Sequence, residues 1–181
     1  MVLLVFLTSC ASVPEKQEEK YQLARMLHLQ NQSDWSFEGR LALTDEKDSV
    51  TANISWKHRV AADLIELSGP LAQGKIAISI TADKVVLDDG ETPKEFDGSA
   101  DLVFSSQLGV DVPIAALRFW VLGVSEPGQP FVERTDGFEQ YGWQIKYNSL
   151  QQVNTEWMPK KIQAEKDKTK IKLIVDQWIL L

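Results

Sequence analysis

An alternation of apolar and polar residues with a period of two constrains the fold of this chain more than any other feature. Between residues 35 and 43, Trp, Phe, Gly and two Leu alternate with Ser, Glu, Arg and Ala, and residues 50–56 and 170–173 repeat the pattern. Successive side chains of a β-strand point to opposite faces of its sheet. Each of these segments therefore predicts a strand with one apolar face.

Other short segments extend this pattern and are separated by turn signals, such as Asp88-Asp89-Gly90. The remaining strands are expected at residues 63–68, 75–81, 84–87, 91–96, 142–148, 160–165 and 169–180. The stretch from Pro127 to Gly137 is expected to be irregular, and a bulge is expected beyond Asp176. The pattern predicts a mainly β protein built on a meandering antiparallel sheet.

Three segments have helical patterns. Ser99 is suited to cap a helix that runs to Leu108 and ends at Gly109. The segment from Pro113 to Gly123 is apolar nearly all round, which is typical of a buried helix. Both helices are expected to form a lid over the concave face of the sheet. Residues 14–32 predict a longer helix that braces the body.

Composition excludes several classes of protein. The net charge of −7 argues against nucleic-acid binding, which needs a basic face to displace counterions from phosphates. No apolar run reaches the ~18 residues of a membrane-spanning helix. The six Trp suit an apolar site with a wet rim better than an ordinary core. The alternating lysines at 166, 168, 170 and 172 fit a solvated hairpin, or else a surface for an acidic partner.

Catalytic constellations are missing from the sequence. His28 and His58 lie far apart, with no Cys or carboxylate at metal-ligand spacing, so no metal is expected. There is no nucleophile elbow and no glycine-rich phosphate loop, so no cofactor is expected. The carboxylate pairs at residues 18–19 and 88–89 fit a helix face and a turn. The sequence argues for a binding protein and against an enzyme.

The single cysteine follows an apolar start in the order Leu7-Thr8-Ser9-Cys10, which matches a bacterial lipobox. Cys10 would then be the lipid attachment site, and Ala11 after it points to the outer membrane; the alternative is an incidental thiol. No Lys or Arg precedes Cys10, so we expect the signal to be truncated. The expected organisation is a signal peptide at 1–9, a lipidated tether and helix at 10–33, and one domain at 34–181.

Several motifs, in a fixed order, carry a family resemblance from Trp35 to Leu180. They are Trp35-x-x-x-Gly39-Arg40, Trp56, Gly69-Pro70-Leu71-x-x-Gly74, Pro113-x-x-x-Leu117-x-x-Trp120-x-x-Gly123, Gly142-Trp143-x-Ile145-x-Tyr147, Met158-Pro159 and Ile171-Lys172-Leu173-x-x-Asp176-x-Trp178. Together with the lipobox they resemble LolB, the outer-membrane lipoprotein receptor family of Gram-negative bacteria. One departure is Ala72, where the family loop has Gly after Pro-Leu.

The resemblance implies a strongly bent antiparallel sheet, an unclosed barrel whose short helices cover an apolar cavity. It implies a lipid-anchored protein on the periplasmic face of the outer membrane, expected to be a monomer. Such a protein accepts triacylated lipoproteins from a LolA-like periplasmic carrier and inserts them among outer-membrane phospholipids, without a cofactor. Pro70 and Leu71 would form the loop that enters the bilayer, unless Leu71 folds back on the sheet edge.

Acyl chains need an apolar concave site. The inward strand residues and the apolar lid residues are the candidates for its lining, although plain core packing is an alternative for each. These candidates are Leu41, Ile54, Trp56, Ile65, Leu67, Ile78, Phe104, Leu117, Trp120, Val121, Trp143, Ile145 and Leu173. The alternative functions are a generic periplasmic lipid-binding protein and an outer-membrane assembly scaffold without lipid cargo.

Overall fold

Eleven strands form one sheet in the computed structural model, which describes residues 20–46, 48–69, 74–108 and 112–181. The strands are β1 (Asp34–Thr44), β2 (Ser49–Arg59), β3 (Ala62–Ser68), β4 (Ile76–Ile80), β5 (Lys84–Asp88), β6 (Lys94–Asp97), β7 (Val132–Arg134), β8 (Gly137–Gln140), β9 (Trp143–Val153), β10 (Glu156–Lys166) and β11 (Thr169–Leu180). Their order in space is β6-β5-β4-β3-β2-β1-β11-β10-β9-β8-β7. The sheet is antiparallel and is not closed into a barrel, which confirms the predicted fold class.

The first and last long strands, β1 and β11, pair at the centre of the sheet. Their register shifts between Glu38 and Gly39, opposite Val175 and Gln177, so that Asp176 is the extra residue of a bulge. Gly39 is required there because an added Cβ would collide with the Ile174 carbonyl oxygen. The bulge predicted from the change of parity near Asp176 is confirmed, and Trp178 is buried while Ile179 is exposed.

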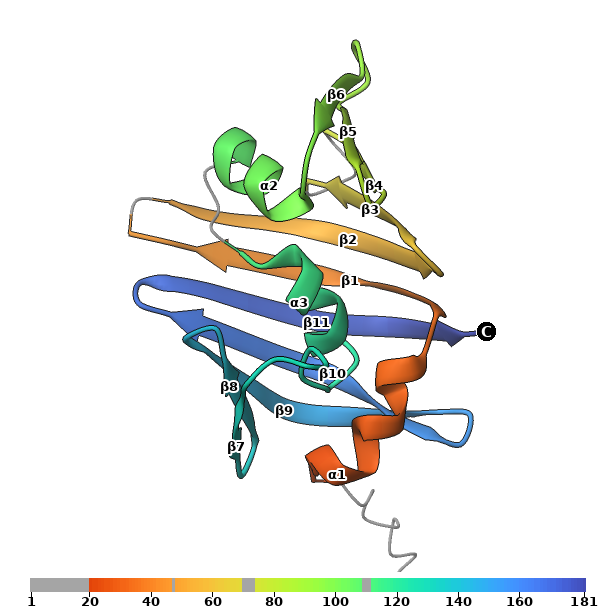
Figure 1. Ribbon diagram of the computed structural model, residues 1–181, viewed down its shortest axis with the longest axis vertical. Helices are drawn as coiled ribbons and strands as arrows, with labels where there is room; N and C mark the ends of the chain where they lie inside the picture. The colour runs from red at the N-terminus through yellow and green to blue at the C-terminus, as the bar shows by residue number, and fades with distance from the viewer. Residues whose placement is uncertain (1–19, 47, 70–73, 109–111) are drawn as a thin grey trace, which may run out of the picture.

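The helices are α1 (Leu23–Met26), the 3-10 helix η1 (Leu27–Asn31), α2 (Ala100–Leu108) and α3 (Ile114–Trp120). Figure 1 shows α2 and α3 lying across the same face of the sheet, with α1 and η1 at the opposite end of the molecule from α2. The prediction of two short helices as a lid is therefore confirmed. The sequence favours Pro113 as the first helical residue, but the structure places it at the N-cap position, directly before Ile114.

Two sequence predictions were wrong. The helix expected at 14–32 is much shorter among the described residues, where α1 begins at Leu23 and changes to 3-10 geometry at Leu27. The stretch from Pro127 to Gly137, expected to be irregular, contains β7 and leads into β8. All residues of β7 are exposed, so this edge strand has no alternation of apolar and polar residues that sequence could reveal.

The N-terminal helical segment does brace the body, as predicted. Tyr21 donates a hydrogen bond from its hydroxyl to the Gly123 carbonyl oxygen at 3.0 Å, and its ring stacks on Tyr147 at 4.4 Å between centroids. Met26 packs against Gly123 so closely that a Cβ there would collide with the methionine. Gly123 also has a φ of 90°, which favours glycine. The segment is thereby fixed to the end of the lid.

Candidate functional site

An apolar cavity lies between the concave face of the sheet and the two lid helices. The strands β1, β2, β3, β9, β10 and β11 contribute its floor, and α2, α3 and Val121 contribute its cover. It is lined by Leu41, Ile54, Trp56, Ile65, Leu67, Phe104, Leu117, Trp120, Val121, Ile145, Ile162, Ala164, Ile171 and Leu173. No charged side chain lines it, so the cavity suits hydrocarbon chains.

The cavity encloses about 80 Å³. Sites that hold a small-molecule ligand usually measure about 300–1,000 Å³. The apolar core is therefore not completely filled, but in this conformation the cavity is too small to hold an acyl chain. Binding of such a chain requires the lid and the sheet to separate.

A cluster of aromatic rings fills the concave face next to the cavity. Trp35 lies 5.5 Å from Trp56 and 5.9 Å from Trp178 between ring centroids, and Phe37 lies 5.1 Å from Trp178. These side chains are almost completely buried. Only Trp56 of this cluster also lines the cavity, and the other three rings pack behind it.

Helix α3 is fixed to one half of the sheet through Trp120. The Tyr147 hydroxyl on β9 donates to the Trp120 carbonyl oxygen at 2.7 Å, and the Trp120 indole donates to Gln140 Oε1 on β8 at 2.8 Å. Gln140 is itself 2 % exposed. Burial is the main cause that raises the pKa of Tyr147 well above its ordinary value, so the hydroxyl stays a neutral donor.

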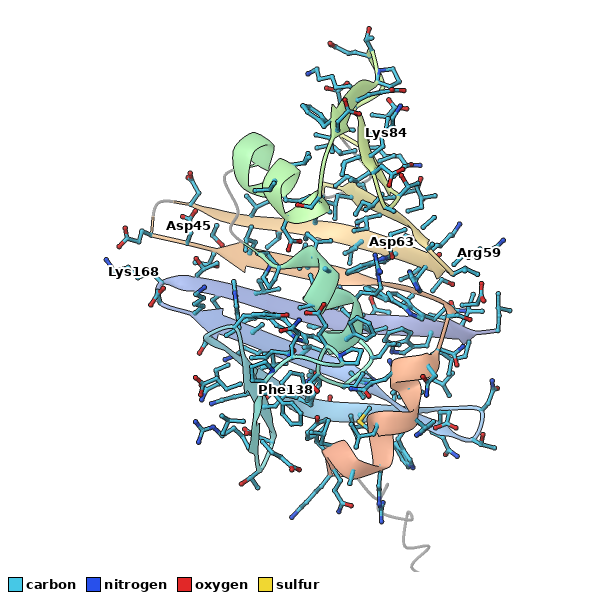
Figure 2. All side chains as sticks on the ribbon, in the orientation of Figure 1. Asp45, Arg59, Asp63, Lys84, Phe138 and Lys168 are labelled. Carbon is cyan, nitrogen blue, oxygen red and sulfur yellow. The ribbon has the colours of Figure 1, made fainter. Side chains whose placement is uncertain are left out.

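The other half of the sheet contacts α3 through a buried carboxylate. Arg118 Nη2 donates to Asp63 Oδ2 at 2.5 Å, while Asp63 Oδ1 accepts hydrogen bonds from Trp56 Nε1 and His58 Nδ1, both at 2.8 Å. Figure 2 shows Asp63 on β3, beside the lid. Burial by itself raises the pKa of Asp63, but the hydrogen bonds from His58 and Trp56 and the charge of Arg118 outweigh it and lower the pKa.

The structure brings together all but two of the predicted lining residues around this cavity. Ile78 is fully buried on β4 and packs in the core away from the cavity. Trp143 is 1 % exposed and lies 6.2 Å from Trp120 between ring centroids, outside the cavity wall. Both face inward as expected, but neighbouring side chains separate them from the space.

Sequence reasoning missed three lining residues, Ile162 and Ala164 on β10 and Ile171 on β11. The signal was present, because residues 162 and 164 share one face of a strand and Ile171 shares the inward parity of Leu173. Cys10, Pro70 and Leu71 lie outside the described residues.

The alternating lysines at 166, 168, 170 and 172 agree in part with the prediction of a solvated hairpin, since Lys168 pairs with Glu46 and Lys170 pairs with Glu165.

Comparison with known proteins decides the family. The family model described as "Outer membrane lipoprotein LolB" matches residues 33–178. The chain belongs to the LolB family. The match covers the whole sheet and lid apart from the last residues of β11. Proteins of the LolB family are outer-membrane lipoproteins, and the outer membrane is therefore the location of this chain.

Two curated LolB relatives show how far the similarity extends. The outer-membrane lipoprotein LolB of Chromohalobacter salexigens is 30% identical over 191 aligned positions, covering 100% of this chain and 89% of the relative. The LolB of Nitrosococcus oceani is also 30% identical, covering 99% of this chain and 95% of the relative. Both relatives are described as outer-membrane lipoproteins.

Among solved structures, a LolA-superfamily protein from Nitrosomonas europaea shares the LolB-family fold seen here. It superposes with a TM-score of 0.54 at 9% sequence identity, covering 88% of this chain and 93% of the other. A putative outer membrane lipoprotein-sorting protein domain from Vibrio parahaemolyticus gives a TM-score of 0.51 at 9% identity, covering 86% and 90%. At such identities the likeness shows the fold alone.

Two further observations concern metal ligands and membrane-spanning helices in this LolB-family chain. Within residues 20–181, apart from the segments left undescribed, His, Cys, Asp and Glu side chains form no group of three that could hold a metal ion. Over the same described residues, the helices are all too short or too polar to cross a bilayer.

Proposed function

We propose that this chain is an outer-membrane receptor that accepts triacylated lipoproteins from a LolA-like periplasmic carrier and inserts them into the outer membrane. The observation that carries the proposal is the apolar cavity under a two-helix lid, in a chain of the LolB family. An apolar cavity without charged lining groups stabilises bound acyl chains by removing them from water. This burial contributes about 0.8 kcal/mol per methylene group.

Handover between two proteins needs only a difference in affinity. A tenfold bias toward the receptor corresponds to ~1.4 kcal/mol, which a few additional aromatic contacts supply without ATP. Trp56, Phe104 and Trp120 line the cavity and provide such contacts with few rotamers to order. Release then requires only that the bilayer bind the acyl chains more strongly than the cavity does.

A lipid anchor, a tether and a membrane-insertion loop complete the proposal. Cys10 would carry the acyl groups that anchor the protein, because several chains anchor durably where one does not. Residues 10–33 would serve as tether and brace, after a signal peptide at 1–9, with the receptor domain at 34–181. Pro70 and Leu71, which lie between β3 and β4 in the sequence, would enter the bilayer and guide the acyl chains into it.

A transfer experiment tests this function. The soluble chain from Ala11 onward is mixed with a LolA-like carrier that holds a triacylated lipoprotein, and pull-down of the chain scores the transfer. The proposal expects transfer of the acylated cargo and none of the same protein without acyl chains. Equal recovery of both cargoes, or of neither, would contradict it.

One observation favours an alternative function. At about 80 Å³ the cavity is nearly filled by its own side chains, as expected of an assembly scaffold without lipid cargo. The two functions differ in whether the wild-type chain takes up a free fatty acid. Uptake of fatty acid without transfer from the carrier would instead indicate a generic lipid-binding protein.

A further inference from the structure

A second, polar pocket lies on the other side of α3 from the apolar cavity. Its charged and polar side chains are Asp101 at the start of α2, Glu126, Tyr141 in the β8–β9 turn and Lys166 at the end of β10. We call it the polar pocket. It measures about 280 Å³, close to the lower end of the range for small-ligand sites.

The polar pocket and the apolar cavity share a wall. Trp143 lines the polar pocket and Trp120 lines the cavity, and the two rings are 6.2 Å apart between centroids. Along α3, Ala116 lines the polar pocket and the next residue, Leu117, lines the cavity. Once the lid separates from the sheet, a molecule with an apolar part in the cavity and a polar part beyond α3 could therefore occupy both.

Tyr141, which lines the polar pocket, lies in a turn with an unusual backbone conformation. Gln140 pairs with Trp143, so Tyr141 and Gly142 form a two-residue hairpin loop, and their φ angles are 55° and 77°. Such loops favour Asn, Asp or Gly, and a tyrosine in the left-handed region is uncommon. Here the Tyr141 hydroxyl donates to Glu126 Oε2 at 2.5 Å, which orients the ring over the pocket.

Lys166 supplies the cation of the polar pocket. Its aliphatic chain passes over the Gly142 backbone, where an added Cβ would lie 3.6 Å from Lys166 Cε. Unlike Lys168 and Lys170, which are paired, Lys166 has no ion-pair partner among the described residues. Its ammonium group is therefore available to donate to a ligand.

The mixture of charges selects the ligand class. A free anion in the polar pocket would meet the carboxylates of Asp101 and Glu126, and a free cation would meet Lys166. A neutral group with both donors and acceptors suits all of them. Lys166 can donate to its carbonyl oxygens, and its N–H groups can donate to Asp101 Oδ2 and Glu126 Oε1, because Asp101 Oδ1 already accepts from the Ala115 N–H and Glu126 Oε2 from Tyr141. Peptide backbone has this character.

We infer that the polar pocket binds the short peptide segment that follows the acylated cysteine of the lipoprotein cargo, while the acyl chains occupy the apolar cavity. This inference rests on the proposed function, because it requires an acylated cargo. Tyr141 and Lys166 would then be specificity residues that distinguish a lipoprotein from a free lipid.

The test compares two probes on one pair of variants. The probes are a synthetic triacylated cysteinyl peptide that continues Ser-Ser-Asn, and a dansyl-labelled fatty acid that has no peptide. The variants are the double substitution Tyr141→Phe with Lys166→Gln, and the control Lys168→Gln at the exposed hairpin tip. Near-ultraviolet circular dichroism checks that each variant keeps its packing.

We expect the double variant to bind the lipopeptide at least about tenfold more weakly than the wild type, since charged hydrogen bonds are lost. Its affinity for the dansyl fatty acid, and both affinities of Lys168→Gln, should stay unchanged. Equal affinities of wild type and double variant for the lipopeptide would overturn the inference, as would an equal loss for both probes. Failure of the wild type to bind either probe would instead overturn the proposed function and the inference with it.

If the double variant does not fold, Lys166→Gln alone serves in its place, because Lys166 is partly exposed and unpaired among the described residues. The same selective loss of lipopeptide binding is then expected. An unchanged lipopeptide affinity for that variant would overturn the inference equally.

Discussion

Arg118 on α3 and Asp63 on β3 form a charged hydrogen bond of 2.5 Å that joins the lid to one half of the sheet. Trp120, two residues further along, fixes the same helix to β8 and β9 in the other half. Helix α3 therefore bridges the two halves of an unclosed sheet, directly over the apolar cavity. Because the cavity must widen to take an acyl chain, the Arg118–Asp63 contact is the natural place for the lid to separate from the sheet.

The substitution Asp63→Asn should lower the free energy of unfolding by about 2–4 kcal/mol, because it leaves the partly buried guanidinium of Arg118 without its counter-charge. Urea unfolding followed by tryptophan fluorescence measures the loss. The double variant Asp63→Asn with Arg118→Gln serves as the control. It should lose less than the sum of the two single variants, and simple additivity would contradict the coupling of these residues.

The stabilisation that Asp63 contributes should also depend on pH. The folded-state pKa of Asp63 lies below its ordinary value of 3.8, so the ionised form is favoured by folding. The contribution is fully present above that ordinary value and is lost as the pH falls through the folded-state pKa. Melting temperatures of wild type and Asp63→Asn should therefore differ at neutral pH and converge below about pH 3.8. A constant difference down to pH 2 would be inconsistent with this.

Release of α3 on the β3 side should speed the entry of lipid. We expect Arg118→Gln to raise the rate of dansyl fatty acid uptake by about tenfold, because one charged hydrogen bond no longer opposes opening. Stopped-flow fluorescence measures the rate. Arg134→Gln, which breaks an exposed ion pair with Glu139 between the edge strands β7 and β8, is the matched control and should leave the rate unchanged. An unaltered rate in Arg118→Gln would show that the lid opens elsewhere.

Filling the cavity should block binding while the fold is kept. Ala164 is 2 % exposed and lines the cavity, so Ala164→Phe places a ring where an acyl chain would lie. Overpacking costs about 1–3 kcal/mol. We expect fatty acid affinity to fall at least about tenfold. Ala42→Phe places the same ring on the outer face, beside Lys172 and Ile174, and should bind normally. Equal binding by both variants would argue that the cavity is ordinary core.

The loop between β3 and β4 should act only at the membrane. Leu71→Glu is expected to leave capture of acylated cargo intact and to block its insertion into liposomes, because a charged side chain does not enter hydrocarbon. Flotation of cargo with liposomes after loading measures insertion. Leu27→Glu changes another leucine, 41% exposed on η1, and should insert cargo normally. If Leu71→Glu also abolishes capture, the loop has a structural role instead.

Much of the cavity lining could be predicted from sequence, because the alternation of residues along a strand indicates which side chains face inward. Ile54 and Trp56 on β2, and Leu41 on β1, were found by parity alone, and the lid residues Leu117 and Trp120 by their position on an apolar helix. Sequence cannot tell which inward side chains border empty space. Ile78 and Trp143 have the same pattern as their neighbours and yet lie outside the cavity.

The polar parts of the site were harder to predict, because their meaning depends on pairing between strands. His58 lies on the same face of β2 as Trp56, and Asp63 lies on the same face of β3 as Ile65, so both side chains point into the core. Only the β2–β3 register, which sets His58 opposite Asp63, brings them together. The Arg118 contact joins residues 55 positions apart and has no local signal.

Site-specific photo-crosslinking tests the central claim, that acyl chains enter the apolar cavity, most directly. Leu173 faces the cavity, and its neighbour Ile174 on the same strand faces the outer surface of the sheet. A photoreactive phenylalanine analogue is placed at one position or the other, and each protein is loaded with lipoprotein that carries a radiolabelled acyl chain. We expect a crosslink to the labelled chain from position 173 and none from 174. A crosslink from 174 alone, or equal crosslinking from both, would contradict it.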